Sequence, residues 1–432
     1  MHKMFARLLS AAALLCVLGS TVALDWEDVT KVLTDAIEDN SFPGCVAVVA
    51  NKSGVVYEAA LGNFTYGLAP PHNKGANPPV SRDTIWDMAS CTKVTTTTTA
   101  VAQLYEMGLL PLETPIGDLF PEFKVHNKEG VTVRNCLLHN AGFPPDPNPF
   151  WNKPEFACPE TKKFHPAENF SCMQKIWDNW AATKLDAPVG AQYVYSDLSF
   201  ITLMFVVGHV VQKHNLVDPS QLLPSCATAS SQPVAAQCHF EAYVRTHVFD
   251  KLGMSDSGFL PVADRAGRCA PTVNDTSYMH TTIQGVVEDP NTYAMGGISG
   301  HAGLFATAPD LLRLGSALMW PNDVPVPVLN ATTIALFTRE ANHTQSSRAL
   351  GWNTNDHTVP DYGFNSSCGS LSKKTWMHDG YTGTMICGDP DREIVVMLLT
   401  NRVYPTETNI KIRQVRTAFS NMVQQVYDQQ LQ

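Results

Sequence analysis

A serine and a lysine three residues apart, Ser90 and Lys93, have the types and spacing of a nucleophilic pair. The segment 90–109 has apolar residues at helical spacing, and residues three apart on a helix share one face. A serine at a helix N-terminus also lies in the positive field of the first-turn amides, which favours developing negative charge. The pair alone is weak evidence, because the same pattern recurs at Ser370 and Lys373. The alternative is an ordinary exposed helix start.

A tyrosine and an aspartate form a second candidate element, Tyr195-Ser-Asp197. They follow an apolar, strand-like segment, 191–194, and precede a predicted helix that begins near Leu198. A tyrosine in this position could accept or shuttle a proton beside a serine. The alternative is a helix cap, in which a side chain accepts hydrogen bonds from first-turn N–H groups.

The third candidate element is the run His378-Asp-Gly380, followed by Tyr381 and Gly383, on a predicted late strand. Glycines at these positions would let the backbone approach a ligand closely, because they carry no side chain. The alternative is an ordinary strand with a bulge.

Other hydrolase and metal motifs do not occur in the sequence. The segment Gly297–His301 misses the Gly-x-Ser-x-Gly motif of lipases by one residue. There is no His-Glu-x-x-His string, and no cysteines have the spacing of a metal site. The sequence therefore predicts chemistry without a metal or an organic cofactor.

The hydrophobic pattern predicts the elements that must bring these candidates together. In chain order we expect a helix over 26–39, a hairpin of 45–50 and 55–61, a short strand over 84–88, the helix from 90, strands over 374–378, 382–388 and 393–400, and a helix over 409–428. This order indicates one sheet built from both ends of the chain, about 24–88 and 300–432. The middle, about 89–299, would be an inserted helical part with a cleft between the two.

Composition and charge limit the class of protein. The chain has 432 residues, of which 44% are hydrophobic, so it can bury enough apolar surface to fold. It carries 30 basic and 40 acidic residues, a net charge of −10. No dense Lys/Arg run occurs, so we expect no nucleic-acid surface and no polybasic membrane patch.

Residues 1–23 have the pattern of a secretory signal peptide. Lys3 and Arg7 give a positive start, residues 8–23 are apolar, and small residues end at Ala23. The apolar stretch is shorter than the roughly 20 residues of a spanning helix. We therefore expect a secreted protein, with residues 24–432 as the hydrolase domain and no membrane span after cleavage.

Export places the cysteines in an oxidising compartment. Two pairs, Cys158 with Cys172 and Cys226 with Cys238, close short loops and are predicted disulfides. Three cysteines in apolar surroundings are expected to be buried free thiols: Cys45, Cys91 and Cys136. Asn-x-Ser/Thr sequons are consistent with a glycoprotein and occur at Asn51, Asn63, Asn169, Asn274, Asn330, Asn342 and Asn365.

In this order the three candidate elements resemble the Ser-x-x-Lys, Tyr-x-Asn and Lys-Thr-Gly motifs of the penicillin-recognising serine hydrolases. That family comprises class C β-lactamases, D,D-carboxypeptidases and related esterases. Further matching segments are Phe42–Gly44, Asp87–Lys93, Leu137–Gly142, Leu252–Met254 and Gly300–Thr307. The resemblance implies an α/β (α+β) fold of the β-lactamase/transpeptidase type, with a central antiparallel sheet, flanking N- and C-terminal helices and an inserted, mostly helical domain.

The resemblance also implies roles for the matching residues. Ser90 would be the nucleophile that forms an acyl-enzyme. Lys93 would ease deprotonation of Ser90 through its charge, or act as base if burial lowers its pKa. Tyr195 would relay the proton. The N–H groups of Ser90 and Tyr381, beside Gly380, would form the oxyanion hole.

Asp197 would orient Lys93 or a substrate amide, and His378 would bind Tyr195 or the substrate. Two positions depart from the family pattern, since Asp197 replaces Asn and Asp379 replaces Thr or Ser. His378 also stands where Lys is common, and it is neutral for much of the time near pH 7. If Asp379 faced the cleft, the third motif would repel an anionic substrate. We therefore expect an esterase or amidase for neutral acyl groups of small-molecule ester, amide or peptide substrates.

The alternatives are a β-lactamase or D,D-carboxypeptidase, a peptidase for D-amino-acid peptides, and a binding protein that kept the fold without turnover. Two further histidines are expected to be structural. His301 is predicted to be hydrogen-bonded rather than part of the cleft, and His139 to support a turn before Gly142.

Overall fold

The computed structural model describes residues 24–158, 170–226, 231–261, 264–276, 279–358 and 366–431. The predicted signal peptide, 1–23, and the sequons at Asn169 and Asn365 lie outside these described residues. Within the described part of the chain, no helix combines the length and the apolar character needed to cross a membrane.

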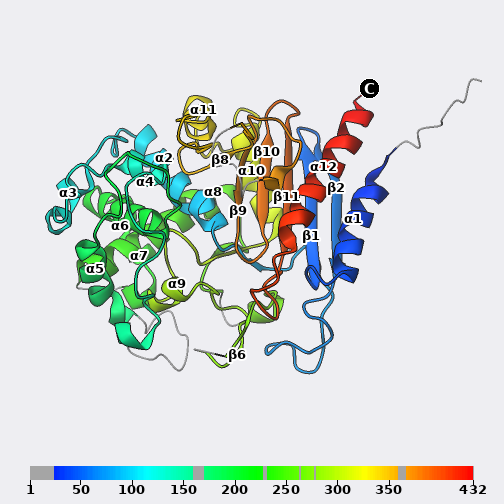
Figure 1. Cartoon of the computed structure of the whole chain (residues 1–432), viewed down its shortest axis with the longest axis horizontal. Coiled ribbons are helices and arrows are strands. Elements are labelled where there is room, and N and C mark those ends of the chain that lie inside the picture. Colours follow the sequence, from blue (N-terminus) through cyan, green and yellow to red (C-terminus); the bar gives the residue numbers. More distant parts are fainter. Residues whose placement is uncertain are drawn as a thin grey trace, which may run out of the picture.

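A six-stranded sheet is built from both ends of the chain, as expected, in the order β2-β1-β11-β10-β9-β8 (Figure 1). Every neighbouring pair is antiparallel. Its strands are β1 (Gly44–Asn51), β2 (Gly54–Gly62), β8 (Asn353–Thr354), β9 (Trp376–Asp379), β10 (Met385–Asp389) and β11 (Ile394–Thr400). The predicted hairpin and the three late strands are therefore confirmed, with ends that differ by a few residues.

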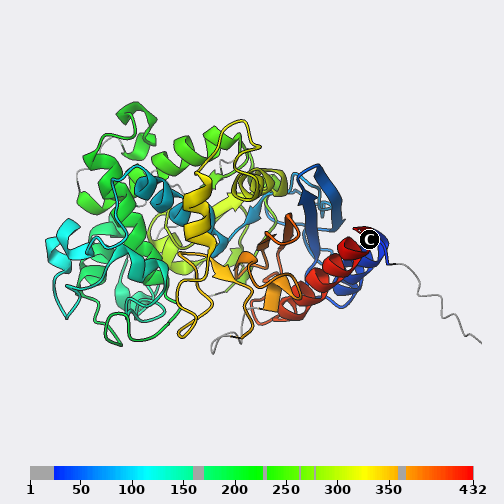
Figure 2. The ribbon, with the colours of Figure 1, turned by 90° about the horizontal axis from the view of Figure 1, so that it is seen from above.

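Helices cover both faces of this sheet. The predicted first and last helices, α1 (Trp26–Glu38) and α12 (Ile412–Gln430), lie together on one face (Figures 1 and 2). Helix α10 (Ala308–Met319) packs on the other face, where Val395 of β11 lies against Gly315. Successive side chains of a strand point to opposite faces, and the first six residues of β11, Ile394 to Leu399, are all apolar. They contribute alternately to the hydrophobic cores on the two faces of the sheet.

The rest of the chain is mostly helical and forms the other half of the molecule (Figure 1). Its helices are α2 (Thr99–Glu106), α3 (Ile116–Leu119), α4 (Val133–Leu137), α5 (Met173–Ala182), α6 (Asp197–Lys213), α7 (Gln232–Val244), α8 (Asp250–Leu252), α9 (Pro290–Ala294) and α11 (Ala331–Thr338). Helix α6 is buried along most of its length, in agreement with its apolar sequence. Short strands form two small sheets: β3 (Trp86–Asp87), β7 (Leu304–Ala306) and β4 (Gly258–Phe259) in one, β5 (Asn274–Asp275) and β6 (Thr281–Thr282) in the other.

The helix predicted over 90–109 is not a regular α-helix throughout. Residues Lys93–Thr98 form a π-helical segment before α2 begins at Thr99. Hydroxyls in the threonine run compete for the helix carbonyls: Thr95 Oγ1 donates to Cys91 O at 2.8 Å, and Thr96 Oγ1 donates to a carbonyl one residue further on. Such bonds and branched side chains disfavour the regular helix.

Both predicted disulfides are present, Cys158–Cys172 and Cys226–Cys238. A third, Cys368–Cys387, joins a short helical turn to β10 and was not predicted. The cysteines expected to be free, Cys45, Cys91 and Cys136, are unpaired and buried, as is Cys269.

Candidate active site

Ser90 follows a strained turn that is held by a buried aspartate. Ala89, just before it, has a left-handed backbone with φ of 44°. The Asp87 carboxylate accepts hydrogen bonds from the N–H groups of Ala89, at 2.9 Å, and Glu288, at 2.8 Å. Burial raises the pKa of Asp87 to about 6. These bonds hold in place a backbone conformation that a residue with a side chain rarely adopts.

The turn between β9 and β10 supports the same backbone from the other side. Thr382 Oγ1 donates to Asp87 O at 2.6 Å, and Thr384 Oγ1 donates to Met88 O at 3.1 Å. A Cβ at Gly380 would lie 2.0 Å from Thr384 Oγ1 and 2.5 Å from Met88 O. The close approach that requires Gly380 is therefore to the nucleophile turn and its support. Gly380 also borders the larger cavity, so the expectation that its backbone lies close to a ligand stays a prediction.

Lys93 lies fully buried beneath Ser90, and its ammonium has three partners. Lys93 Nζ is 2.9 Å from Ser90 Oγ, 3.0 Å from His301 O and 2.7 Å from Asp197 Oδ1. Burial is the largest single influence and favours the neutral amine, but the charge of Asp197 and the interactions with Tyr195 together outweigh it, so the pKa of Lys93 is raised. Lys93 therefore carries its charge at neutral pH. Asp197 begins α6, close to the predicted helix start.

Tyr195 lies beside this ammonium, with Lys93 Nζ 5.0 Å from the centre of its ring. Burial raises the pKa of Tyr195, although the charge of Lys93 opposes the shift, so the phenol is protonated at neutral pH. The preceding segment, 191–194, was predicted to be strand-like and is irregular. The backbone of this segment makes hydrogen bonds to a loop instead of a strand: Val194 N–H donates to His139 O at 2.9 Å.

His139 holds the loop that carries Tyr195. Besides its carbonyl contact, His139 Nδ1 accepts the N–H of Ser196 at 3.0 Å. Its ring stacks on Tyr195 with a centroid separation of 4.6 Å. Burial and the charge of Arg348 keep its pKa well below the usual range, so the ring is neutral. The expected structural role is correct, but its contact with Tyr195 was missed; the apolar segment around His139 was the only signal.

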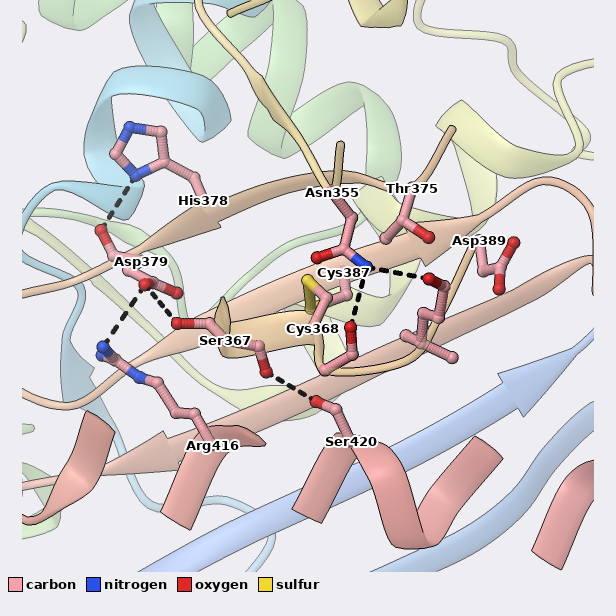
Figure 3. The surroundings of a disulfide bond; sticks show 12 residues. Asn355, Ser367, Cys368, Thr375, His378, Asp379, Cys387, Asp389, Arg416 and Ser420 are labelled. Carbon is pink, nitrogen blue, oxygen red and sulfur yellow. Dashed lines mark hydrogen bonds and ion pairs between the residues drawn. A yellow bond between two sulfur atoms is a disulfide. The ribbon is translucent and has the colours of Figure 1, made fainter. Parts of the chain in front are cut away.

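His378 and Asp379 leave β9 in different directions (Figure 3). The Asp379 carboxylate accepts a hydrogen bond from Ser367 Oγ at 2.5 Å and lies 3.5 Å from Arg416 Nη1 of α12. His378 Nδ1 lies 2.8 Å from the backbone oxygen of Asp379. Asp379 borders the larger cavity, as the expectation of repulsion required, but its carboxylate has a cationic partner in Arg416, which reduces the negative charge that a substrate would meet.

Arg416, which was not predicted from the sequence, holds the backbone of the His378–Gly383 run in place. Its Nη2 donates to Gly380 O and to Thr384 O, each at 2.7 Å. These bonds fix the start of the β9–β10 turn, so the next N–H, that of Tyr381, has a defined direction. Neither Tyr381 N–H nor Ser90 N–H donates to another described residue. Both are therefore available to a ligand oxygen.

Two cavities meet at Ser90. The first has a volume of ≈ 960 Å³ and is lined by Ser90, Tyr195, His378, Gly380 and Tyr381, among others. The second, of ≈ 590 Å³, is also lined by Ser90, Tyr195 and Tyr381, and in addition by Asp197. Every site residue predicted from the sequence except the buried Lys93 thus borders one or both cavities. The arrangement offers a hydroxyl, a cation, a phenol and two N–H donors around one point, as acyl transfer requires.

His301 lies under the second cavity and is hydrogen-bonded, as expected, although it also borders the cavity. Its Nε2 is 2.9 Å from Asp289 Oδ1, and its Nδ1 is 2.8 Å from Ser299 Oγ. Although burial opposes it, the interaction with His301 lowers the pKa of Asp289 to about 2.

Two groups among the described residues bring three metal-ligand atoms within 4.8 Å of one another: Asp197 with Asp289 and His301, and Glu340 with His343 and Asp356. In the first group, the ammonium of Lys93 already balances the charge of Asp197. A cation-binding role is therefore not needed to explain it.

A model of the Beta-lactamase family matches residues 29–418. A protein of Salmonella agona named as a D-alanyl-D-alanine carboxypeptidase is 25% identical over 354 residues, which are 76% of this chain and 72% of that one. Simvastatin synthase from Aspergillus terreus, a LovD6 mutant, has a similar structure with a TM-score of 0.64, 17% identity and coverage of 95% and 99%. EstCE1, a hydrolase with promiscuous acyltransferase activity, aligns with a TM-score of 0.61, 19% identity and coverage of 91% and 98%.

The two structural likenesses concern the fold, whereas the family match spans most of the sequence. The predicted β-lactamase/transpeptidase-like fold is confirmed. The chain belongs to the Beta-lactamase family of serine hydrolases.

Proposed function

We propose that this protein is a secreted serine hydrolase that cleaves small esters or amides through an acyl-enzyme on Ser90. The observation that carries the proposal is the contact of 2.9 Å between the Ser90 hydroxyl and the buried, charged Lys93. A cation at this distance stabilises the alkoxide that forms as Ser90 loses its proton. Of the two roles considered for Lys93, its raised pKa favours electrostatic support over that of a resting base.

In the acylation step, Ser90 Oγ forms a bond to the substrate carbonyl carbon, and the carbonyl oxygen gains negative charge. The N–H groups of Ser90 and Tyr381 would stabilise that oxygen, at about 3–4 kcal/mol for each donor. The phenol of Tyr195 is protonated, so it can accept the proton of Ser90 only while it donates its own phenolic proton. Tyr195 would donate that phenolic proton to the leaving oxygen or nitrogen as the bond to the carbonyl carbon breaks.

Deacylation would reverse these roles with water. The water oxygen attacks the acyl carbon, its proton moves through Tyr195 to Ser90 Oγ, and the acid product leaves. Asp197 keeps Lys93 charged and fixed throughout, at 2.7 Å. No cofactor enters any of these steps.

The substrate class rests on His378, which stands where the family often has lysine. Burial and the nearby charges of Arg348 and Lys93 lower the pKa of His378 well below its usual range, so it offers no cation to a substrate carboxylate. This supports an esterase or amidase for neutral acyl groups. The three disulfides agree with export to an oxidising compartment.

A D,D-peptidase is the second candidate, favoured by arginines along the larger cavity: Arg348, Arg402, Arg413 and Arg416. Of these, Arg402 and Arg416 already bind backbone oxygens, which reduces what they can offer a carboxylate. We therefore rank this activity below that of an esterase.

The test is mass spectrometry of the folded, mature protein after reaction with a fluorophosphonate, with a peptide map of the adduct. We expect one adduct on Ser90 in the wild type and none in Ser90→Ala. Turnover would then be compared across short-chain aryl esters, D-alanyl peptides and a cephalosporin. Absence of any adduct would favour a binding protein without turnover. Efficient cephalosporin hydrolysis without ester turnover would contradict the esterase.

A further inference from the structure

The larger cavity contains a buried acceptor without a partner, His378 Nε2. His378 is 4% exposed and lines the cavity together with Ser90. Its Nδ1 lies 2.8 Å from Asp379 O, and a carbonyl can only accept, so Nδ1 carries the proton. Since the ring is neutral, Nε2 keeps its lone pair. No donor among the described residues reaches Nε2.

The same cavity contains a buried donor without a partner, Arg348 Nη1. Arg348 is 5% exposed, and its Nε donates to the Tyr193 hydroxyl at 3.2 Å. Its guanidinium carbon lies 5.6 Å from the Tyr193 ring centre and 5.2 Å from that of Tyr195. The two rings and this bond fix the guanidinium, while no acceptor among the described residues reaches Nη1.

Both unpartnered groups border Tyr195. The His378 ring is 6.3 Å from the Tyr195 ring, over which Arg348 also lies. A buried polar group without a partner costs on the order of 1–3 kcal/mol, and a charged group costs more. A ligand that satisfies both groups recovers this cost, which makes them a source of specificity.

We infer that Arg348 and His378 bind a neutral carboxamide of the substrate, whose oxygen accepts from Arg348 Nη1 and whose N–H donates to His378 Nε2. This inference rests on the proposed function, since it concerns the substrate cleaved at Ser90. A carboxylate would satisfy Arg348 but would direct an oxygen lone pair at the lone pair of His378. A methyl ester would leave His378 without a donor, and an alkyl group would satisfy neither residue.

The experiment compares aryl monoesters that differ only at the far end of the acyl chain: carboxamide, methyl ester and carboxylate. Chains of four to six carbons would be tested, and rates in Ser90→Ala would be subtracted as background. We expect kcat/KM for the best carboxamide to exceed that of the matched methyl ester and carboxylate by about 10-fold or more. A ratio near one, or a faster carboxylate, in active enzyme would overturn the inference.

Variants test the assignment to these two residues. His378→Leu removes the acceptor, and we expect it to bring the carboxamide-to-ester ratio close to one. His378→Lys should shift the preference toward the carboxylate. His343→Leu is the matched control at an exposed histidine and should keep the wild-type ratio. If His378→Leu is folded and retains the full preference, the assignment is wrong.

The same experiments distinguish failure of the proposed function from failure of this inference. If no ester is turned over and Ser90 forms no fluorophosphonate adduct, the proposed function fails, and the inference fails with it. If the adduct forms and esters are cleaved without preference, only the inference fails.

Discussion

The two cavities that meet at Ser90 differ in charge. Arginines line the larger cavity: Arg348, Arg402, Arg413 and Arg416. Carboxylates dominate the smaller one: Asp146, Asp197, Asp275, Glu288, Asp289 and Glu407. Ser90, Tyr195 and Tyr381 stand on the boundary. The larger cavity also contains Asp379, which is paired with Arg416, and Glu407 borders both cavities. The nucleophile thus lies between a lining rich in arginines and one rich in carboxyl groups, and such an arrangement can orient a polar substrate.

The two sides also differ in how their charges are balanced. On the acidic side, the ammonium of Lys93 pairs with Asp197, and Asp289 has His301 as a hydrogen-bond partner within the protein. On the arginine side, Arg348 Nη1 has no acceptor among the described residues. This comparison indicates that the acidic side prepares the nucleophile, whereas the arginine side is left incomplete for a ligand.

The largest effect is expected from Lys93→Met, which removes the positive charge that balances the acidic side. We expect kcat/KM to fall on the order of 10³-fold or more, because Ser90 loses its cationic support. The free energy of unfolding should also fall, by about 1–3 kcal/mol, since Asp197 is partly buried and loses its cation, although its remaining exposure to water reduces the cost. Ester hydrolysis and urea unfolding measure the two effects.

Lys31→Met is the matched control. Lys31 makes an exposed ion pair with Asp35 on α1, at 2.8 Å. Water screens such an exposed pair, so the urea midpoint should stay close to that of the wild type. Equal losses for the two variants would show that the buried pair has no special role.

The second largest effect is expected from His139→Ala, which would disturb the position of Tyr195 between the two cavities. The loop of Tyr195 would lose the side-chain bond to Ser196 and the stacked ring. We expect kcat to fall about 100-fold, because small displacements of a reacting group are costly. Steady-state kinetics measure this, with circular dichroism as a check of folding. An unchanged kcat in folded His139→Ala would contradict a positioning role.

A smaller effect is expected on stability from Asp146, on the acidic side. Burial and then the charge of Asp197 raise the pKa of Asp146 from 3.8 to about 6. The folded chain therefore binds the proton of Asp146 more tightly than the unfolded chain does. The contribution of Asp146 to the free energy of unfolding falls as the pH rises from about 4 to 6. Asp146→Asn should raise the free energy of unfolding at pH 7.5 by about 1–2 kcal/mol, after allowance for partial exposure.

The gain should vanish near pH 4, where Asp146 is protonated in the folded chain. Urea unfolding at both pH values measures the difference. Asp178→Asn, at an exposed position, is the control, and its effect on the free energy of unfolding should be the same at both pH values. A gain for Asp146→Asn that did not depend on pH would contradict the electrostatic explanation.

The smallest effect is expected from Tyr381→Phe. The phenol of Tyr381 is exposed and donates to Glu407 at 3.1 Å, while Arg402 lies 4.3 Å from its ring centre. The variant keeps the ring and the backbone N–H, so we expect kcat/KM to change by about 2-fold at most. A large loss would assign a catalytic role to the hydroxyl, which the proposed mechanism does not use.

The main residues of the candidate site could be predicted from short stretches of sequence. Ser90 and Lys93 are close because they share one helical turn, and Tyr195 and Asp197 are adjacent to a helix start. The disulfides that close short loops were predictable for the same reason. Each of these features depends on neighbours along the chain, which a sequence displays directly.

The parts that were missed depend on segments far apart in the chain. Cys368–Cys387 depends on the pairing of β10 within the sheet. Arg416 reaches Gly380 only because α12 folds back across β9 and β10. The position of Arg348 beside Tyr195 likewise depends on two loops that are far apart in the chain.

By itself, the sequence determined the reactive residue types, their spacing and the family to which they belong. The tertiary structure decided the direction of each side chain and the balance of charge around it. Asp379 illustrates the difference: its residue type suggested repulsion of anions, but its direction on β9 brings it to Arg416. Charge interactions depend on distance and burial, and those are set by the fold.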